Sequence, residues 1–419
     1  MKTLENYFIR FKALPPFFSD KPAADTNIIV IIPCYDDEFV FRTLESLENA
    51  RHYYLKEQSS SCEVIVNVNS GETTPREIIE HNILIFNELQ HKAQAGFYKN
   101  FRLLPILVEG TVKKKAGVGY ARKTAMDEAL RRFAMIEKPD GLIVSLDADT
   151  LVSPDYFKVI TKAMQHADAK CFTFQFRHNF DATMYSKEVI EACKLYEIYL
   201  RYYRLALKTF NSPFAIHTIG SCFAIRAEAY AQVGGMPPRQ GGEDFYFLQK
   251  AAKMHPVYEV REQIVFPSPR ISDRVPFGTG PSVGHIIADG SYRVYNFGLF
   301  GVLRRFYDCF LPDCFVPRND VPINDVPEEV LDFIGEENFE AAVKESIRYS
   351  SSHKAFVKRM LNIYDAFFIV KFLNSFKQKS DFPPIDVMEV AKQILDYFYV
   401  DYQGKDIYEE IVKLDLATI

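Results

Sequence analysis

The sequence predicts an α/β fold with a mostly parallel sheet, followed by a helical C-terminal region. Short unbroken apolar runs occupy the first two thirds of the chain, helical patterns separate them, and strand-like runs stop after about residue 290. Continuous apolar runs bounded by turn residues are typical of strands buried on both faces of a parallel sheet. Their alternation with helices favours the α/β class.

Four apolar runs predict buried strands. They cover residues 28–32, 64–68, 103–108 and 142–146. The clearest helix between them spans residues 118–133, where alanines recur on one stripe and charged residues lie off it. Another helix is expected to start at Ser153-Pro154-Asp155, because serine caps helices and proline suits the first helical position.

The last third of the chain shows helical periodicity and no clear strand run. The predicted helices are residues 328–333, 338–349, 355–376, 385–400 and 407–414. Prolines separate these segments at Pro312, Pro317, Pro322 and Pro383-Pro384. We therefore expect two domains, residues 1–290 and 291–419. A further helix over 188–208 carries Tyr196, Tyr199, Tyr202 and Tyr203, which form either a core-facing stripe or an acceptor groove.

Composition sets limits on the class of protein. The chain has 419 residues, 48% hydrophobic and 25% charged, which suits two packed domains and argues against wholesale disorder. A net charge of -5 gives no global reason to expect a nucleic-acid partner. The seven cysteines, Cys314 among them, form no C-x-x-C pair, and neither a signal peptide nor a spanning segment is indicated. We expect a cytoplasmic protein with reduced thiols.

Asp147-Ala148-Asp149 follows the fourth apolar run directly. Ligands of open α/β sheets bind beyond the carboxyl ends of the strands, and two carboxylates two residues apart in extended chain project to the same side. Such oxygen ligands hold hard divalent cations such as Mg²⁺ or Mn²⁺, which neutralise a diphosphate. The alternative is that one aspartate only caps the turn that follows.

Gly241-Gly242-Glu243-Asp244 is a second candidate. Adjacent carboxylates raise one another's pKa, which suits a general base. The alternative is a glycine turn followed by the acidic first turn of a helix over residues 245–254, which the helix dipole alone favours.

A third candidate segment, residues 31–38, ends the first run with Pro33, Tyr35 and a series of acids. An aromatic ring next to acids can stack on a nucleobase while the acids accept hydrogen bonds from it or from a ribose. The alternative is a strand-to-helix turn with acids at the start of the helix.

Taken in order, these segments resemble the inverting glycosyltransferases of family 2, which bear a D-x-D motif on a nucleotide-sugar-binding fold. Residues 28–38 look like the family's opening strand with its proline, aromatic and acids, and residues 141–149 like its D-x-D strand. A small-residue segment with a Gly-Gly turn, residues 220–237, and the pair Glu243-Asp244 follow. Residues 234–249 also resemble the Gly-Glu-Asp segment of β-1,4-galactosyltransferase-like enzymes. The resemblance covers about residues 27–290.

The resemblance implies a Rossmann-like, glycosyltransferase A type sheet and a role for each matching residue. Asp244 is implied as the catalytic base, with Glu243 orienting the acceptor. Asp149 is implied as a metal ligand, and Asp147 as a contact to the ribose or the metal. The implied donor-binding residues are Pro33, Tyr35, Glu38, Asn69, Arg122, Asp147 and Arg274.

Some of these assignments have open alternatives. Arg122 matches a basic position near the donor, but an exposed helical arginine fits equally. Asn69 stands near the end of the second strand, where the family has an aspartate that reads the base. Arg274 lies between glycines in residues 272–280, either a loop over the diphosphate or an ordinary surface loop. His285 is implied as a third metal ligand, with His255 as its competitor.

We therefore expect a glycosyltransferase dependent on Mn²⁺ or Mg²⁺, acting with inversion in glycan or polysaccharide biosynthesis. Its donor would be a UDP- or GDP-sugar and its acceptor a glycan, a lipid-linked sugar or a small molecule. The aromatic and basic segment 292–310 either packs on the catalytic domain or makes peripheral membrane contact. The alternatives are a catalytically silent nucleotide-sugar-binding scaffold, a haloacid-dehalogenase-like phosphatase, whose first motif residues 146–152 also fit, and a sugar-nucleotide pyrophosphorylase.

Overall fold

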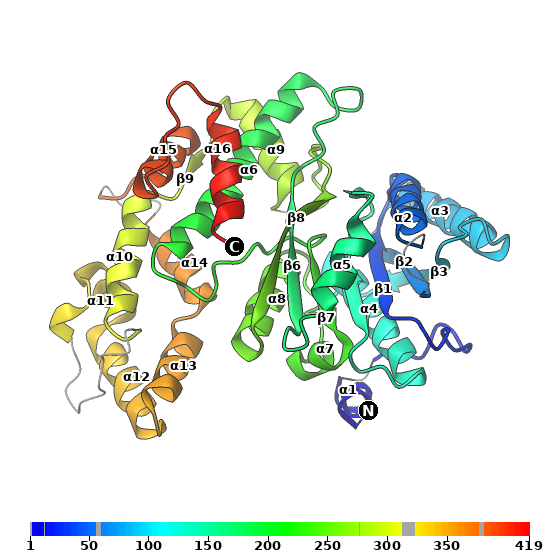
Figure 1. Ribbon diagram of the computed structural model, residues 1–419, viewed down its shortest axis with the longest axis horizontal. Helices are drawn as coiled ribbons and strands as arrows, with labels where there is room; N and C mark the ends of the chain where they lie inside the picture. The colour runs from blue at the N-terminus through cyan, green and yellow to red at the C-terminus, as the bar shows by residue number, and fades with distance from the viewer. Residues whose placement is uncertain (1, 12, 56–59, 276, 312–322, 377–380) are drawn as a thin grey trace. The chain divides into compact units, whose positions relative to one another are not determined.

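The computed structural model describes residues 2–11, 13–55, 60–275, 277–311, 323–376 and 381–419 (Figure 1). Cys314 and the predicted breaks at Pro312, Pro317 and Pro322 lie outside these residues. The chain forms two compact units. The first contains Met1–Cys193, His217–His285 and Ile419, and the second contains Lys194–Ile216 and Ile286–Thr418.

An eight-stranded sheet forms the centre of the first unit, in the order β3-β2-β1-β4-β7-β6-β8-β5. The strands are β1 (Ile28–Cys34), β2 (Cys62–Gly71), β3 (Arg102–Thr111), β4 (Leu142–Ser145), β5 (Leu151–Val152), β6 (Cys171–Phe176), β7 (Phe223–Arg226) and β8 (Val257–Phe266). Strands β3, β2, β1 and β4 are parallel to one another, β7 is antiparallel to both its neighbours, and β5 is antiparallel to β8. The predicted α/β class with a mostly parallel sheet is confirmed.

All four apolar runs are strands, as predicted. β1 is buried along its whole length and lies between β2 and β4, with Val30 opposite both Val64 and Val144. A strand with neighbours on both edges and helices over the sheet has no solvent face, which explains why its sequence does not alternate.

One helix precedes these strands and others connect them. They are α1 (Lys2–Phe11), α2 (Val40–Leu55), α3 (Arg76–Gln94), α4 (Val118–Met135), α5 (Tyr156–Met164), α7 (Ala227–Val233) and α8 (Glu243–Met254), and α9 (Thr279–Asp289) follows the sheet. The predicted helix over residues 118–133 is α4, which packs on β1, β2 and β4. The predicted start at Ser153 is wrong, since α5 begins at Tyr156. The pairing of β5 with β8 keeps the chain extended up to Ser153, whose N–H donates to the Ile264 carbonyl at 3.0 Å.

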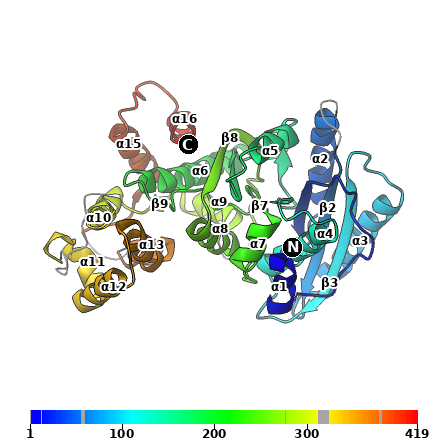
Figure 2. The ribbon, with the colours of Figure 1, turned by 60° about the horizontal axis from the view of Figure 1, so that its bottom comes forward.

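The described part of the second unit is mainly helical. It holds most of α6 (Lys187–Lys208), then α10 (Phe297–Asp308), a short 3₁₀ turn (Ile323–Asp325), α11 (Glu328–Ile334), α12 (Glu336–Arg348), α13 (His353–Ile363), α14 (Ala366–Ser375), α15 (Val387–Tyr397) and α16 (Ile407–Ala417). Figure 2 shows α11, α12 and α13 side by side, in agreement with their contacts. The predicted helical C-terminal region is confirmed.

Two details of this unit differ from the sequence prediction. The helix expected over residues 355–376 is two helices, because Asp365 caps α14 by accepting from the N–H groups of Phe367 at 2.8 Å and Phe368 at 3.1 Å. Strands were not expected here, yet β9 (Arg293–Val294) pairs with β10 (Ile385–Asp386). Two-residue strands are too short to leave a periodic signal.

The aromatic segments of the second unit pack within it. Tyr202 is fully buried and its hydroxyl donates to the Tyr295 carbonyl at 2.9 Å, which fits the core-facing interpretation of the α6 tyrosines. Helix α10 buries its apolar face and contacts α11 and α15. Among the described residues, no helix has both the length and the apolar character needed to cross a membrane.

Candidate active site

A cleft of about 740 Å³ opens in the first unit at the carboxyl ends of the parallel strands. The ends of β1 and β2, the loop after β3, the segment after β4 and the segment after β8 line it. Six of the predicted site residues are among its lining: Pro33, Tyr35, Asn69, Asp147, Asp149 and Arg274. The cleft therefore lies where an open α/β sheet binds its ligand.

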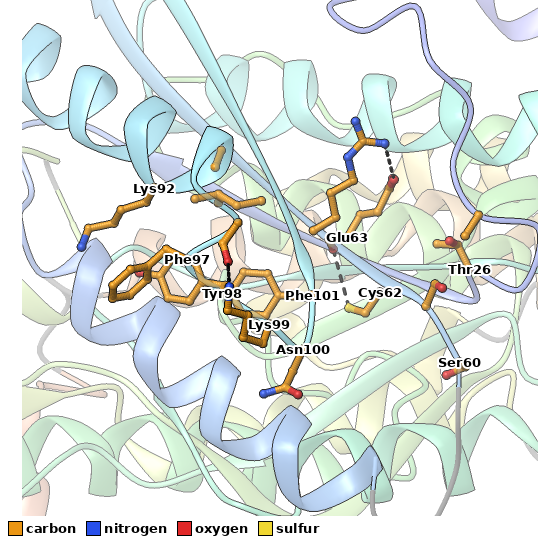
Figure 3. Close-up of a pocket in the computed structure, with 16 residues that line it drawn as sticks. Thr26, Ser60, Cys62, Glu63, Lys92, Phe97, Tyr98, Lys99, Asn100 and Phe101 are labelled. Atoms are coloured by element: carbon orange, nitrogen blue, oxygen red, sulfur yellow. Dashed lines mark hydrogen bonds and ion pairs between the residues drawn. The ribbon is translucent and has the colours of Figure 1, made fainter.

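A second cavity, of about 520 Å³, lies at the opposite edge, by the amino ends of β2 and β3 (Figure 3). Its wall includes Phe97, Tyr98 and Phe101, and the rings of the last two stack 4.9 Å apart. No predicted site residue lines this cavity. The carboxyl-edge cleft is the candidate donor site.

Arg122 joins the cleft-lining Asp147 to Glu243, which with Asp244 is not part of the cleft lining. From α4, its Nη2 donates to Asp147 Oδ1 at 2.8 Å and its Nε to Glu243 Oε1 at 3.2 Å. Nη1 donates to the Gly220 carbonyl at 2.9 Å and also contacts the Ser145 hydroxyl. The side chain is 2% exposed, so the exposed-helix alternative is wrong. A fixed guanidinium thus holds the D-x-D segment beside the Glu-Asp pair.

Glu243 and Asp244 occupy the first turn of α8, one residue after Gly242, whose φ of 66° suits glycine. The helix-start interpretation is therefore confirmed, and the role of the pair in a site stays a prediction. Burial, followed by the charge of Glu243, raises the pKa of Asp244 well above its usual range, although Arg122 and the Phe245 N–H act in the opposite direction. A carboxylate with a raised pKa suits a general base near neutral pH.

Asp149, the second acid of D-x-D, pairs with an arginine that the sequence analysis did not single out. Its Oδ2 lies 2.8 Å from Arg270 Nη2. Burial raises the pKa of Asp149 to about 6, while Arg270 acts in the opposite direction. Arg270 also donates from Nη1 to Asp37 Oδ1 at 3.2 Å and contacts the other oxygen of Asp37 through Nη2.

Arg274 is anchored at the same place. Its Nη1 donates to the Tyr35 carbonyl at 2.7 Å and to Asp37 Oδ2 at 3.1 Å. Asp37, 4% exposed, therefore takes two arginines from the segment after β8. The signals for this pairing were an acid in the segment after β1 and a second arginine four residues before Arg274.

Glu38 lies apart from the cleft lining. Its side chain is 74% exposed and accepts from His81 Nε2 at 2.9 Å, while His81 Nδ1 lies 2.6 Å from Asp36 Oδ1. Hydrogen bonds to Glu38 and then to Asp36 raise the pKa of His81. The Asp36 N–H donates to Asn82 Oδ1 at 2.8 Å, so α3 fixes the backbone that presents Tyr35.

Asn69 is buried at the end of β2, and its carbonyl accepts from Asn82 Nδ2 at 3.1 Å. Because it lines the cleft, its amide stands where the family's aspartate was expected. His285 is exposed on α9 and does not line the cleft, nor does His255 at the end of α8. This placement gives no support to a histidine metal ligand.

Two carboxylates that line the cleft, Asp147 and Asp149, could hold a divalent cation. Among the residues that the structure describes, no group of three or more histidine, cysteine, aspartate or glutamate side chains is placed to hold a metal. Mg²⁺ usually takes one or two carboxylates and completes its shell with substrate phosphates and water. Asp147 and Asp149, side by side at the cleft, fit that partial donor set.

Residues 111–257 match the sequence model of the family described as "Glycosyltransferase like family 2". The matched stretch runs from the end of β3 to the start of β8 and includes Arg122, Asp147, Asp149, Glu243 and Asp244. Residues 111–257 therefore form a glycosyltransferase family 2-like domain, as the sequence analysis predicted, and the class that this part of the chain defines is a glycosyltransferase.

The solved structures that resemble this chain share little sequence identity with it and have low TM-scores. TarS residues 1–349 of S. aureus, in complex with UDP-GlcNAc, is 13% identical with a TM-score of 0.40, covering 81% of this chain and 91% of that one. The mannosyltransferase PcManGT of Pyrobaculum calidifontis, in complex with GDP-Man and Mn²⁺, is 14% identical with a TM-score of 0.37, covering 99% and 92%. The M. tuberculosis glucosyl-3-phosphoglycerate synthase is 12% identical with a TM-score of 0.33, covering 66% and 86%. Curated proteins give no match.

Proposed function

We propose that the protein transfers a sugar from a nucleotide-sugar donor to an acceptor hydroxyl, with inversion and with the help of Mn²⁺ or Mg²⁺. One observation carries the proposal. Arg122 holds the D-x-D carboxylate Asp147 at 2.8 Å and Glu243 at 3.2 Å, so the helix turn that carries the candidate base Asp244 is tied to an acid that lines the cleft.

The donor would lie along the lining of the cleft. Tyr35 and Asn69, from the ends of β1 and β2, would contact the base and ribose. Asp147 and Asp149 would hold the cation, which when bound supplies positive charge to the departing diphosphate. Arg274, already anchored to Asp37, would add a guanidinium that matches phosphate oxygens.

Asp244 would take the proton of the acceptor hydroxyl. As the acceptor oxygen bonds to the anomeric carbon, the bond from that carbon to the diphosphate breaks on the opposite face, which inverts the configuration. Glu243 is buried and bonded to Arg122, so it would fix the helix turn that carries Asp244 and orient the acceptor. Burial of Asp244 keeps its pKa high enough to accept the proton near neutral pH.

The remaining assignments extend the same proposal. The catalytic domain would be residues 1–290, with residues 291–419 as a helical extension. UDP- or GDP-sugars would be the donors, and the acceptor a glycan, a lipid-linked sugar or a small molecule in the cytoplasm. Peripheral membrane contact by residues 292–310 can be tested by flotation with anionic liposomes, where absence of binding removes it.

Ligand-induced thermal stabilisation tests the proposal. The protein is melted with UDP, GDP, ADP or CDP, each with Mn²⁺, with Mg²⁺ and with EDTA. A ligand at 100 times its Kd stabilises the folded state by about 2.7 kcal/mol, so the true nucleotide should raise the Tm clearly and only with metal. Asp149→Ala should lose the metal-dependent part of the shift. If no nucleoside diphosphate shifts the Tm under any condition, the proposed function is wrong.

Donor hydrolysis separates the enzyme from a silent binder. The nucleotide that stabilises the protein is supplied as its sugar conjugates, and release of free nucleoside diphosphate is followed with and without metal. Metal-dependent release supports the transferase, whereas binding without any release by the wild type favours the scaffold. Covalent trapping of a phosphoryl-aspartate would favour the phosphatase instead.

A further inference from the structure

Arg270 lies between two carboxylates of the cleft. Its Nη2 is 2.8 Å from Asp149 Oδ2, and its Nη1 donates to Asp37 Oδ1 at 3.2 Å. The Arg270 side chain is 26% exposed and the Asp149 side chain 23%, so both reach the open cleft. The guanidinium therefore occupies Oδ2, one of the two oxygens that Asp149 could offer to a cation.

The two carboxylates depend on Arg270 to different degrees. Asp37 is also bonded to Arg274 at 3.1 Å, so it stays compensated if Arg270 turns away. Among the described residues, the basic side chain that forms an ion pair with Asp149 is that of Arg270. A partly desolvated carboxylate is costly without a counter-ion, so the ionised Asp149 should hold one positive charge, from Arg270 or from a metal.

Arg270 has N–H donors that could bind a phosphate group in addition to its carboxylate partners. Its Nε is buried and has no hydrogen-bond partner among the described residues. A guanidinium offers five N–H donors in a planar fork that matches two phosphate oxygens. Ser268, Ser272 and Arg274, from the same segment after β8, also line the cleft and have donors that suit phosphate oxygens.

We propose that Arg270 is the resident counter-ion of Asp149, and that it exchanges this carboxylate for the donor's diphosphate when donor and divalent cation bind together. The inference rests on the proposed function and goes beyond it by making Arg270 a determinant of metal and donor binding. Two ligands that compete for one carboxylate weaken each other, and the weakening is reciprocal. The free protein should therefore bind Mn²⁺ poorly, and the nucleotide should restore tight binding by giving Arg270 another anion.

The test measures Mn²⁺ binding itself, by isothermal titration calorimetry and by the electron paramagnetic resonance signal of free Mn²⁺. Arg270→Gln should bind Mn²⁺ without nucleotide at least about fivefold more tightly than the wild type, within the usual range of coupling between sites. The same variant should bind the nucleoside diphosphate with saturating Mn²⁺ about tenfold more weakly, since it lacks one charge-assisted phosphate contact. Arg76→Gln, at an arginine whose side chain is 90% exposed on α3, should match the wild type in both.

Two further variants locate the effect. The double variant Asp149→Ala, Arg270→Gln should lose the gain in Mn²⁺ affinity, because the released carboxylate is gone. Arg270→Lys keeps the charge without the fork and should change both affinities in the same directions by less. Circular dichroism and thermal melts check folding; if Arg270→Gln fails to fold, Arg270→Lys carries the test.

The possible failures are distinguishable. If the wild type binds no nucleoside diphosphate with any metal, the proposed function fails. If the wild type binds nucleotide with Mn²⁺ but the folded Arg270 variant keeps the wild-type affinity for Mn²⁺ alone, only the role of Arg270 is overturned.

Discussion

Each unit of the protein contains a buried arginine bonded to two carboxylates, and the two clusters differ in their access to solvent. In the first unit, Arg122 bonds Asp147 and Glu243, and Asp147 keeps 32% of its side chain exposed at the cleft. In the second unit, Arg201 bonds Glu197 at 2.7 Å and Asp415 at 2.6 Å. All three side chains of that cluster are fully buried.

The second cluster joins two helices. Asp415 on α16 also accepts from Arg204 Nη1 at 2.7 Å, and the Tyr408 hydroxyl donates to Glu197 at 2.9 Å. These contacts connect the C-terminal helix to α6 within one unit. Both clusters satisfy the rule that buried charges are paired, so pairing alone does not identify a functional site. An opening onto a cleft and an adjacent carboxylate with a raised pKa distinguish the Arg122 cluster.

The largest effect is expected at the carboxylate next to the Arg122 cluster. Asp244→Asn keeps the shape of the side chain but accepts no proton, so turnover should fall by roughly two to four orders of magnitude. Donor binding should be spared, because the base faces the acceptor hydroxyl. Steady-state kinetics at saturating substrates and a nucleotide-binding titration give the two readouts. Near-normal transfer by the folded variant would show that another group is the base.

Removal of a carboxylate from the other cluster should affect stability instead. Asp415→Asn leaves Arg201 and Arg204 buried with one fewer negative partner, which should lower the free energy of unfolding by about 3–5 kcal/mol. Urea unfolding followed by circular dichroism measures this loss.

The matched control for Asp415→Asn is Asp401→Asn, in the same unit, where the side chain is 76% exposed, pairs with Lys405 and accepts from the Gln403 N–H. The urea midpoint of that variant should stay at the wild-type value. An Asp415 variant with wild-type stability would refute the structural role, and the comparison between the clusters with it.

A conservative change at each arginine sharpens the contrast. Arg122→Lys keeps the charge but loses the fork that reaches Asp147 and Glu243 together, so kcat/KM should fall about ten- to a hundredfold. Arg201→Lys should lower stability and leave kcat/KM near the wild-type value. Equal kinetic losses in the two folded variants would contradict the division into a functional and a structural cluster.

The sequence predicted the strands around the cleft well for a physical reason. Residues 28–32 and 64–68 are buried on both faces, so their apolar character is continuous and visible without knowledge of their partners. The apolar run 142–146 is visible for the same reason, and its end places Asp147 and Asp149 at the carboxyl edge of the sheet. The two-residue strands β9 and β10 leave no such pattern, because two residues are too few to show a period.

The electrostatic part of the site was largely out of reach of the sequence. Helix α4 buries Arg122 and Arg132 together with its alanines, so an apolar stripe on one face gave no guide to which arginine is enclosed. Arg270 meets Asp37 across 233 residues of sequence. Such a pairing depends on where β8 ends relative to β1, which is decided by sheet order and is not encoded in local periodicity.

The smallest expected effect concerns the dependence of stability on pH at the rim of the cleft, where Asp149 differs from the enclosed acids. Burial raises its pKa to about 6, from about 3.9 for an unperturbed aspartate. The folded state therefore takes up this proton more readily than the unfolded state. That advantage is present below about pH 4 and is lost as the pH rises through 6.

Asp149→Asn removes this titration from the metal-free protein. In EDTA, the free energy of unfolding of the variant relative to the wild type should therefore rise by about 1–2 kcal/mol between pH 4 and pH 7, after allowance for the partial exposure of the side chain. Urea unfolding at pH intervals across this range measures the difference. Asp155→Asn, at an exposed aspartate just before α5, should follow the wild-type curve. If the free energy of unfolding of the Asp149 variant follows the wild-type curve across this pH range, Arg270 compensates the charge of Asp149 fully. The contrast between the cleft-facing Arg122 cluster and the enclosed Arg201 cluster would then rest on geometry alone.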